Sequence, residues 1–528
     1  MAASEKLRYA AGRLIVGKVP GTDLDADSRI LLESGIMGGV TFFKDNAQSL
    51  SQLSDLAFDI IDAYSTNSET LPFMTTDQEG GAVQRFDHVL TAMPSAMALS
   101  ATDNLSFLRE ITAINAQELK LLGFNCLLSP VLDIAINEKN PIVSTRAFGN
   151  NIQKVATCGK AVIETLKNEG MLAVGKHFPG HGGTTEDTHV GLAVNDKTID
   201  ELSKTELEPF KANLSQLPAM LTSHVWFSSI DKQPMPASLS YKITTELLRE
   251  KLQFDRLVIT DDLLMKAITN KWALPEAAIM ALEAGADILL TCGTAAEIRS
   301  VHEAVVSAVE SGRLSEERID KSLRRLERAM LPLSKERYLQ IRAGKRLDSV
   351  KKIEASLTRN RKICLEAAES AICQLRGTMP NLKSALNTLN KWIIVGPENP
   401  RYQLNLSSYL ERLGICLKQV RYSLNPTLEE CQTIQEQVKG NNCIFLTFRT
   451  AVFPEQVLLG NLLKNECSET LAVATDAPFD ANYLPQWDNY MATFDPSDLA
   501  MEALATILAT GRKPSGKCPT GIAASEAS

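Results

Sequence analysis

A chain of 528 residues is too long for one ordinary domain and indicates two or three. Hydrophobic residues make up 44% and charged residues 22%, which is the balance of a soluble globular protein. The formal net charge of -8 is spread along the chain without a basic run, which argues against binding to nucleic acid or to an anionic membrane surface.

The first residues and the cysteines indicate the compartment. The start, MAASEKLRYAAGRLIVGKVPG, lacks an apolar core of signal-peptide length. No stretch approaches the roughly 20 apolar residues of a membrane span. The ten cysteines include no C-x-x-C pair, which is typical of reduced and mostly buried thiols. We therefore expect a cytoplasmic protein.

Short apolar runs alternate with helical stretches through the first part of the chain. Helical stretches such as LREITAINAQELKLLG have apolar residues at the spacing of one helix face. The predicted strands cover residues 13–19, 38–43, 72–78, 124–134, 172–178, 219–226, 256–262 and 286–291. This pattern predicts an α/β fold, a (β/α)₈ TIM-like barrel. An open doubly wound sheet gives the same alternation and is the alternative.

Polar residues stand at the ends of five successive predicted strands. They are Asp77, Asp133, Lys176 with His177, His224, and Asp261 with Asp262. The active sites of such barrels lie at the carboxyl ends of the strands and in the loops that follow. We therefore predict that the functional site lies at the barrel mouth.

The segment KHFPGHGGTTEDTHVG, residues 176–191, holds three of the six histidines. Its prolines and glycines exclude a helix, so we expect a strand end followed by a long loop. Asp187 and His189 are two positions apart, so a turn can bring the carboxylate against one imidazole nitrogen. The other nitrogen then exchanges protons as a general acid/base. The alternatives are a purely structural loop and a zinc site made of His177, His181, Asp187 and His189.

Asp261 is the candidate partner of this histidine. The run VITDDLLM places Val258 and Ile259 in the barrel wall and brings Asp261 to the mouth. An ionised carboxylate held there can attack an electrophilic carbon and form a covalent intermediate. The alternative role for Asp261 is the N-cap of a helix that begins at Leu263, although Asp262 can fill that role instead.

The pattern changes after residue 335, the predicted end of the barrel domain. Residues 336–360 are highly charged and predict a linker or a surface helix. Further β-rich runs cover residues 392–397, 443–448, 470–475 and 490–494. They predict a second, smaller domain over residues 361–528, an α/β sandwich with a mostly parallel sheet.

Four motifs together are similar to glycoside hydrolase family 3. They are TDQEGGAVQRF (76–86), STRAFG (144–149), KHFPGHGGTTEDTH (176–189) and VITDDLLM (258–265). The resemblance covers roughly residues 8–330 and is to the β-N-acetylglucosaminidase branch, which recycles bacterial cell-wall fragments. It implies a retaining exo-β-N-acetylglucosaminidase that acts on small carbohydrates, such as muropeptide-like fragments, without a metal or other cofactor.

The resemblance also implies roles for single residues. The nucleophile falls on Asp261, and the acid/base falls on His189, paired with Asp187. The sugar-binding residues, which hold hydroxyl groups and the acetamido group, match Asp77, Arg85, Arg146, Lys176 and His177. Retaining glycosidases place acid and nucleophile about 5.5 Å apart, across the bond that is cut.

Several alternatives stay open. Arg85 can instead be a surface charge, and Lys176 can instead form an ion pair with Asp133. Ala82 and Leu264 depart from residues common in the family and bear on how the substrate beyond the first sugar is held. A β-glucosidase or β-xylosidase of the same family, a metal-dependent hydrolase and a non-catalytic sugar-binding protein are the competing functions. A neutral histidine would also tolerate phosphate as acceptor.

Overall fold

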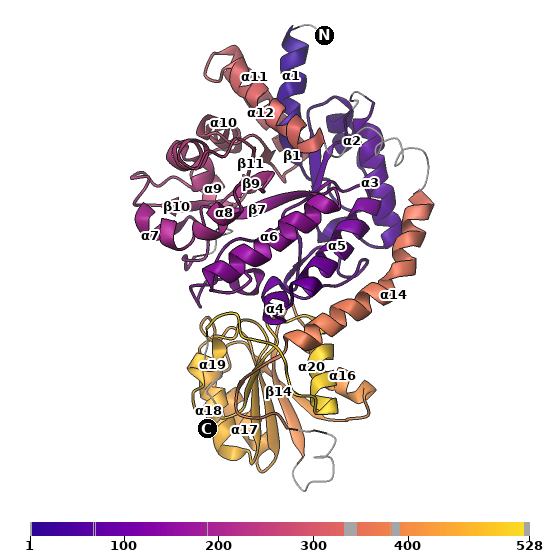
Figure 1. Cartoon of the computed structure of the whole chain (residues 1–528), viewed down its shortest axis with the longest axis vertical. Helices are drawn as coiled ribbons and strands as arrows, with labels where there is room; N and C mark the ends of the chain where they lie inside the picture. Colours follow the sequence, from indigo (N-terminus) through magenta and orange to yellow (C-terminus); the bar gives the residue numbers. More distant parts are fainter. Residues whose placement is uncertain are drawn as a thin grey trace.

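The computed structural model is described over residues 3–66, 70–186, 190–331, 346–380 and 391–521, and at Ser68, Thr188 and Leu382. Two α/β units make up the molecule, and α14 (Arg346–Ala371) runs along both of them (Figure 1). Over the described ranges no helix combines the length and the apolar character that a bilayer span requires.

The first unit contains two four-stranded parallel sheets. The spatial order in the first sheet is β12 (Leu289–Leu290), β1 (Ile15–Gly17), β2 (Gly39–Phe42), β3 (Phe73–Thr76). The spatial order in the second sheet is β11 (Leu257–Thr260), β9 (Ala219–Thr222), β7 (Leu172–Phe178), β6 (Cys126–Leu127). The sheets meet at both edges. Leu128 N donates to Thr76 O at 3.2 Å, and Thr260 N donates to Ile288 O at 3.0 Å. The strands are therefore arranged as in a (β/α)₈-type barrel, which confirms the predicted fold class.

Helices cover the outside of these strands. They are α1 (Ala3–Arg13), α2 (Ala26–Glu33), α3 (Leu50–Tyr64), α5 (Leu105–Leu121), α6 (Ile152–Asn168), α7 (Ile199–Lys204), α8 (Glu208–Asn213), the π-helix η4 (Lys242–Lys251), α9 (Lys266–Thr269), α10 (Leu274–Ala284), α11 (Ala295–Glu310) and α12 (Glu316–Met330). Helix α6 shows why such helices form here. The Asn151 side chain caps its first turn by accepting from Lys154 N, and Val155, Val162 and Leu166 share its buried face.

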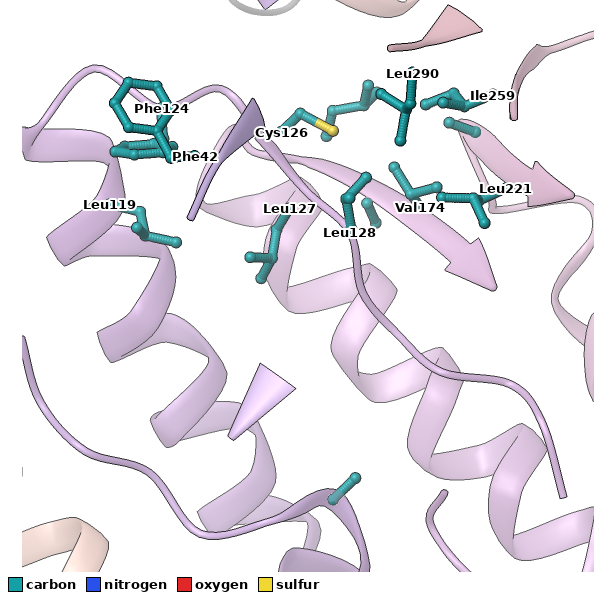
Figure 2. Packing of buried hydrophobic residues seen from close by; sticks show 14 of the residues in the cluster. Phe42, Leu119, Phe124, Cys126, Leu127, Leu128, Val174, Leu221, Ile259 and Leu290 are labelled. Atoms are coloured by element: carbon teal, nitrogen blue, oxygen red, sulfur yellow. The ribbon is translucent and has the colours of Figure 1, made fainter. Parts of the chain in front are cut away.

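Apolar side chains from neighbouring strands fill the interior of the barrel unit. Val174, Leu221, Ile259 and Leu290 come from four successive strands, and Figure 2 shows them pointing toward one another. All four are at most 3% exposed. At the other side of the view the ring of Phe42 packs on that of Phe124. Close packing of this kind fixes where each strand ends and therefore where the polar residues that follow it lie.

Three predicted strands are wrong in detail. The predicted strand 124–134 is only β6 as a regular strand, because Pro130 has no N–H and interrupts the ladder, although residues 129–132 still form backbone hydrogen bonds with β7. The predicted strand 72–78 stops at Thr76, and a hairpin of β4 (Gln78–Gly80) and β5 (Val83–Gln84) follows. The predicted strand 219–226 is two strands, since β9 ends at Thr222 and β10 (Val225–Phe227) pairs with β8 (Ala193–Asn195) instead.

The second unit is built on a six-stranded sheet. Its spatial order is β13 (Cys373–Arg376), β18 (Tyr490–Ala492), β17 (Thr470–Ala474), β16 (Asn442–Thr447), β14 (Trp392–Glu398), β15 (Lys418–Ser423). Every pairing is parallel except that of β13 with β18, which confirms the mostly parallel sheet. Its helices are α16 (Leu406–Arg412), α17 (Leu428–Val438), α18 (Gln456–Glu466), α19 (Asp480–Tyr483) and α20 (Asp498–Thr510).

Helix α14 connects the two units. Residues 332–345 lie outside the described residues, and from Arg346 onward the predicted linker is helical and continues past residue 360. The helix packs on α3, α5 and α4 (Ala96–Ala101) of the barrel and on α20 of the second unit. Buried Asn360 donates to Glu118 of α5 at 2.9 Å. The segment 346–371 therefore belongs to the packing of both units.

Candidate active site

Five charged side chains form one network at the carboxyl ends of β3 and β7. Lys176 Nζ lies 2.6 Å from Asp77 Oδ1 and 2.5 Å from Glu79 Oε1. Arg146 binds Glu79 through two parallel hydrogen bonds of 2.8 Å. Arg85 Nη2 donates to Asp77 Oδ2 at 3.2 Å. Four of the predicted sugar-binding residues thus belong to one network, and Glu79, which was not predicted, joins Arg146 to it through Lys176.

The hairpin of β4 and β5 places Glu79 in this network. Gly80 and Gly81 turn the chain with φ of 103° and 56°, where residues with a Cβ are disfavoured. A Cβ on Gly81 would lie 2.5 Å from the side chain of Ser95, so the turn packs directly on the segment before α4. The sequence EGG already shows this turn, and an acid just before a tight glycine turn is the signal by which Glu79 could have been found.

The cations of the network keep both acids ionised. Burial disfavours the charged form of Asp77, but Lys176 and Arg85 outweigh it and hold the pKa of that carboxyl below its ordinary range. At Glu79, burial is likewise overcome by Arg146 and Lys176, and the pKa falls to about 2. The Lys176 side chain is only 2% exposed, so its charge depends on these two partners. Asp77, which is 20% exposed, is therefore the ionised carboxylate of the network that can accept from a polar ligand.

Asp133 holds both histidines of the strand end. Its carboxylate lies 2.6 Å from His177 Nδ1 and accepts from His181 N at 2.7 Å. Burial works against its charge, and His177 and His181 keep its pKa low. Burial, and then the neighbouring His177, lower the pKa of His181 to about 4, so this ring is neutral at pH 7. The alternative pairing of Lys176 with Asp133 is wrong, because Asp133 binds His177.

The geometry bears on the zinc alternative. His177 Nε2 lies 3.4 Å from Arg146 Nη2, so a cation at this nitrogen would face a guanidinium. Thr188 Oγ1 lies 3.3 Å from His181 Nε2. Among the residues that the structure describes, no group of three or more His, Cys, Asp or Glu is placed to hold a metal ion. Asp187 and His189, the other members of the predicted zinc site and of the predicted acid/base pair, lie outside the described residues.

Asp261 follows β11 directly and reaches the mouth of the barrel. Its N–H donates to Thr222 O at 3.1 Å, and its carboxylate accepts the N–H of Asp262 at 2.9 Å. Burial raises the pKa of this carboxyl, but the nearby His224 and His177 more than compensate and lower it. An ionised, partly exposed carboxylate is the state that a nucleophile requires. The capping alternative is wrong, since α9 begins at Lys266 rather than at Leu263.

Asp262 and His224 support this strand end. The Asp262 carboxylate accepts the N–H groups of Leu264 and Cys292, each at 3.1 Å, which holds the turn after β11. Burial raises its pKa to about 6. His224 Nε2 lies 2.9 Å from Asp262 O, and because a carbonyl only accepts, this nitrogen carries the proton. His224 Nδ1 then faces the Ser238 hydroxyl at 2.7 Å.

A barrel mouth lined by paired carboxylates, cations and imidazole is the setting in which hydrolases of polar ligands work. Residues 9–329 match the model of the glycosyl hydrolase family 3 N terminal domain. The chain belongs to this family. As a family 3 enzyme it is a glycoside hydrolase with a carbohydrate substrate, and the predicted resemblance is confirmed.

Curated relatives of this family 3 hydrolase match just over half of the chain. A beta-hexosaminidase of Nitrosomonas eutropha is 35% identical over 306 residues, which cover 56% of this chain and 86% of the relative. A beta-hexosaminidase of Haemophilus influenzae is 32% identical over 302 residues, with 56% of this chain and 82% of the relative covered.

Solved structures also match the second unit. The family 3 β-N-acetylglucosaminidase from Paenibacillus sp. str. FPU-7 is 28% identical with a TM-score of 0.86, covering 98% of this chain and 99% of its own. A β-glucoside phosphorylase, 19% identical with a TM-score of 0.77, covers 99% of this chain and 94% of its own, and this likeness shows the fold alone. The family 3 hydrolase therefore shares its whole two-unit architecture with a solved relative.

Proposed function

We propose that this glycoside hydrolase is a retaining exo-β-N-acetylglucosaminidase. The observation that carries the proposal is the ionised carboxylate of Asp261 at the barrel mouth, beside the network that contains Asp77, Lys176 and Arg146. The names of the curated relatives and of the Paenibacillus structure support the choice of sugar. The natural substrates are proposed to be cell-wall fragments that end in β-linked N-acetylglucosamine.

In the proposed first step the Asp261 carboxylate attacks the anomeric carbon and forms a glycosyl-aspartate. Protonated His189, oriented by Asp187, gives its proton to the leaving oxygen as the glycosidic bond breaks. In the second step neutral His189 takes a proton from water, whose oxygen attacks the same carbon and releases Asp261. Two inversions give a product of retained configuration. Because neutral His189 does not repel an anion, phosphate is a second proposed acceptor.

The charged network is proposed to hold the terminal sugar. Asp77 is ionised and 20% exposed, so its oxygens can accept from sugar hydroxyl groups. Arg85, Arg146, Lys176 and His177 supply donors around it, and each hydrogen bond to a charged group contributes about 1.5–3 kcal/mol. Arg85 also lies over the Phe43 ring at 5.6 Å, which favours a fixed orientation over a freely moving surface charge.

A side-by-side assay tests the proposal. We expect kcat/KM on the 4-nitrophenyl β-glycoside of N-acetylglucosamine to exceed by far the values on the β-glucoside and the β-xyloside. Proton NMR of the first-formed sugar should show the β anomer. Equal or faster cleavage of the glucoside would refute the proposed specificity, and a first-formed α anomer would refute retention.

A further inference from the structure

Two aspartates at the carboxyl edge of the second sheet are buried against the barrel. Asp476 follows β17 and Asp495 follows β18, which are neighbouring parallel strands. They are 3% and 1% exposed. In Figure 1, α4 lies where the two units meet. Buried carboxylates must be satisfied by partners, and here several of the partners belong to the barrel.

Asp476 holds the turn that carries Arg146. The Ser144 hydroxyl donates to Asp476 Oδ2 at 2.7 Å, and the Thr145 hydroxyl donates to Asp476 Oδ1 at 3.3 Å. These two residues form the 3₁₀ turn η2 (Ser144–Arg146), whose last residue binds Glu79. One carboxylate of the second unit thus fixes the two residues that precede the guanidinium of the site.

Arg449 extends this contact to the histidine loop. Its guanidinium lies 3.4 Å from Asp476 and donates to the carbonyl groups of Asn140 and Pro141 at 2.6 and 3.2 Å. The Asn140 side chain in turn donates to His181 O at 2.8 Å. Arg449 has φ of 52°, a conformation that non-glycine residues adopt mainly where the surroundings impose it.

Asp495 holds the barrel segment that supports Glu79, the partner of Arg146. Its Oδ2 accepts the N–H of Ser95 at 3.0 Å. The segment around Ser95 supports the hairpin that carries Glu79, because Gly81 N donates to Met93 O at 2.9 Å and Gly81 packs directly on Ser95. The two barrel segments that bring Glu79 and Arg146 together are thus each tied to an aspartate of the second unit.

We propose that Asp476 and Asp495 are positioning residues for the Arg146–Glu79 pair, so that the second unit sets the shape of the sugar-binding side of the barrel mouth. The proposal rests on the proposed function for its kinetic consequence. Hydrogen bonds from Ser144, Thr145 and Ser95 orient the segments, and neither aspartate is part of the charged network itself. If the Arg146 guanidinium is displaced, the bound sugar is held less precisely and kcat/KM falls.

The first test is kinetic. Asp476→Asn and Asp495→Asn keep the shape of the side chain and remove the charge that the barrel groups bind. We expect each to lower kcat/KM on the N-acetylglucosaminide about 10-fold, mainly through KM, and to leave the proportion of folded protein unchanged. Lys517→Ala is the matched control, because Lys517 binds Asp103 of the barrel at 2.7 Å across the same contact without touching the site segments.

The second test separates positioning from general support of the fold. In an Arg146→Ala background, Asp476→Asn should change kcat/KM by less than about twofold, because the group that it positions is gone. Multiplicative losses in the double variant would overturn the proposal, as would wild-type KM in both single variants. Ser144→Ala combined with Thr145→Val removes the same hydrogen bonds from the barrel side and should reproduce the loss.

Hydrogen exchange gives a readout that does not need activity. Asp476→Asn should increase amide exchange in residues 140–147, Asp495→Asn should do so in residues 78–96, and Lys517→Ala should do neither. Unchanged exchange in both segments would overturn the proposal. If the wild-type protein cleaves none of the glycosides, the proposed function fails, and this exchange experiment still decides the positioning role.

Discussion

At the scale of single residues, Glu79 belongs to the candidate site and also contributes to the stability of the barrel. It is 4% exposed and binds both Arg146 and the buried Lys176, whose other carboxylate partner is Asp77. A buried pair is costly to break from one side, because the remaining charge is left without compensation. The residue that organises the predicted sugar-binding groups is therefore also a structural one.

We expect Glu79→Ala to reduce the free energy of unfolding by about 3–5 kcal/mol, because Arg146 loses its bidentate partner and buried Lys176 keeps only Asp77. Urea unfolding followed by circular dichroism measures this. Glu276→Ala is the control, since Glu276 forms an exposed ion pair with Arg313 and should cost no more than about 1 kcal/mol. A loss at Glu79 no larger than that of the control would mean that solvent or another acid replaces it.

The proposed roles of Asp261 and His189 make different kinetic predictions. Asp261→Ala should nearly abolish turnover of every glycoside, because no covalent intermediate forms. His189→Ala should depend on the leaving group, since leaving-group protonation is worth about 10²–10⁴-fold. A dinitrophenyl glycoside should still react in a burst, and a sugar leaving group should not.

The second half of the reaction checks the same histidine. In His189→Ala the intermediate lacks its base, so azide, which needs no base, should release it as the β-glycosyl azide. Asp187→Ala should show a milder form of this behaviour, because it orients the imidazole without transferring the proton. Equal slowing of activated and unactivated substrates, without a burst or azide release, would leave His189 without an acid/base role.

At the scale of elements, the sequence predicted buried strands well and strand ends less well. The predicted strand 172–178 is β7 residue for residue, because its run of buried apolar residues is bounded by a glycine turn and a proline. The edge strands β13 and β15 escape prediction because partly exposed polar residues alternate along them. The hairpin of β4 and β5 was not predicted, because the motif TDQEGGAVQRF that contains it was interpreted as a strand end and the loop after it.

The residues of the site were easier to predict than their contacts. Asp77, Lys176, His177 and Asp261 stand at strand ends, so barrel geometry alone brings them together. The bond between Ser144 and Asp476 joins residues 332 positions apart, and no local pattern encodes it. Glu79 lies between these cases, since its neighbours show a turn but nothing in the sequence shows which cations it binds.

Helix α19 of the second unit begins with a buried acid that makes stability depend on pH. Asp480 accepts the N–H of Thr450 at 2.6 Å, and burial raises its pKa to about 7. Its unfolded pKa is about 3.9, so the folded state binds the extra proton between these values. The unfolding free energy should therefore fall as pH rises from about 5 to 7.5.

We expect Asp480→Asn, which mimics the protonated acid, to reduce this fall. Urea midpoints at pH 5 and pH 7.5 measure it, and this range lies above the one in which the pKa of Glu79, about 2, affects stability. Asp498→Asn is the control, because Asp498 is exposed at the start of α20. The same pH dependence in both variants would show that Asp480 is ionised throughout.

At the scale of the whole molecule, α14 determines whether the barrel remains stable when it is cut from the second unit. The groups proposed for chemistry all belong to residues 1–335, and the groups proposed for positioning belong to the second unit. Ile353, Cys364 and Ala367 of α14 are fully buried, so removing this helix exposes apolar surface on the barrel. We therefore expect a truncated barrel to lose stability and positioning together, whereas the groups proposed for chemistry remain.

We therefore expect a fragment of residues 1–335 to cleave an activated N-acetylglucosaminide with a raised KM and a lower melting temperature than the full chain. A fragment that ends at residue 372 keeps α14 and should recover melting temperature more than KM. Thermal unfolding and initial rates separate the two effects. A folded fragment with no turnover at all would place an essential catalytic group in the second unit.

Parallel α/β sheets commonly bind their ligands outside the carboxyl ends of the strands. In the second unit, segments of the barrel lie at this position. Asp476 accepts the hydroxyls of Ser144 and Thr145 there, and Asp495 accepts the N–H of Ser95. Arg449 donates to the barrel carbonyl groups of Asn140 and Pro141. The barrel thus occupies the position at which other parallel sheets bind a small ligand. A small molecule that bound there would have to displace the barrel segments, and it would inhibit the enzyme without occupying the sugar-binding site.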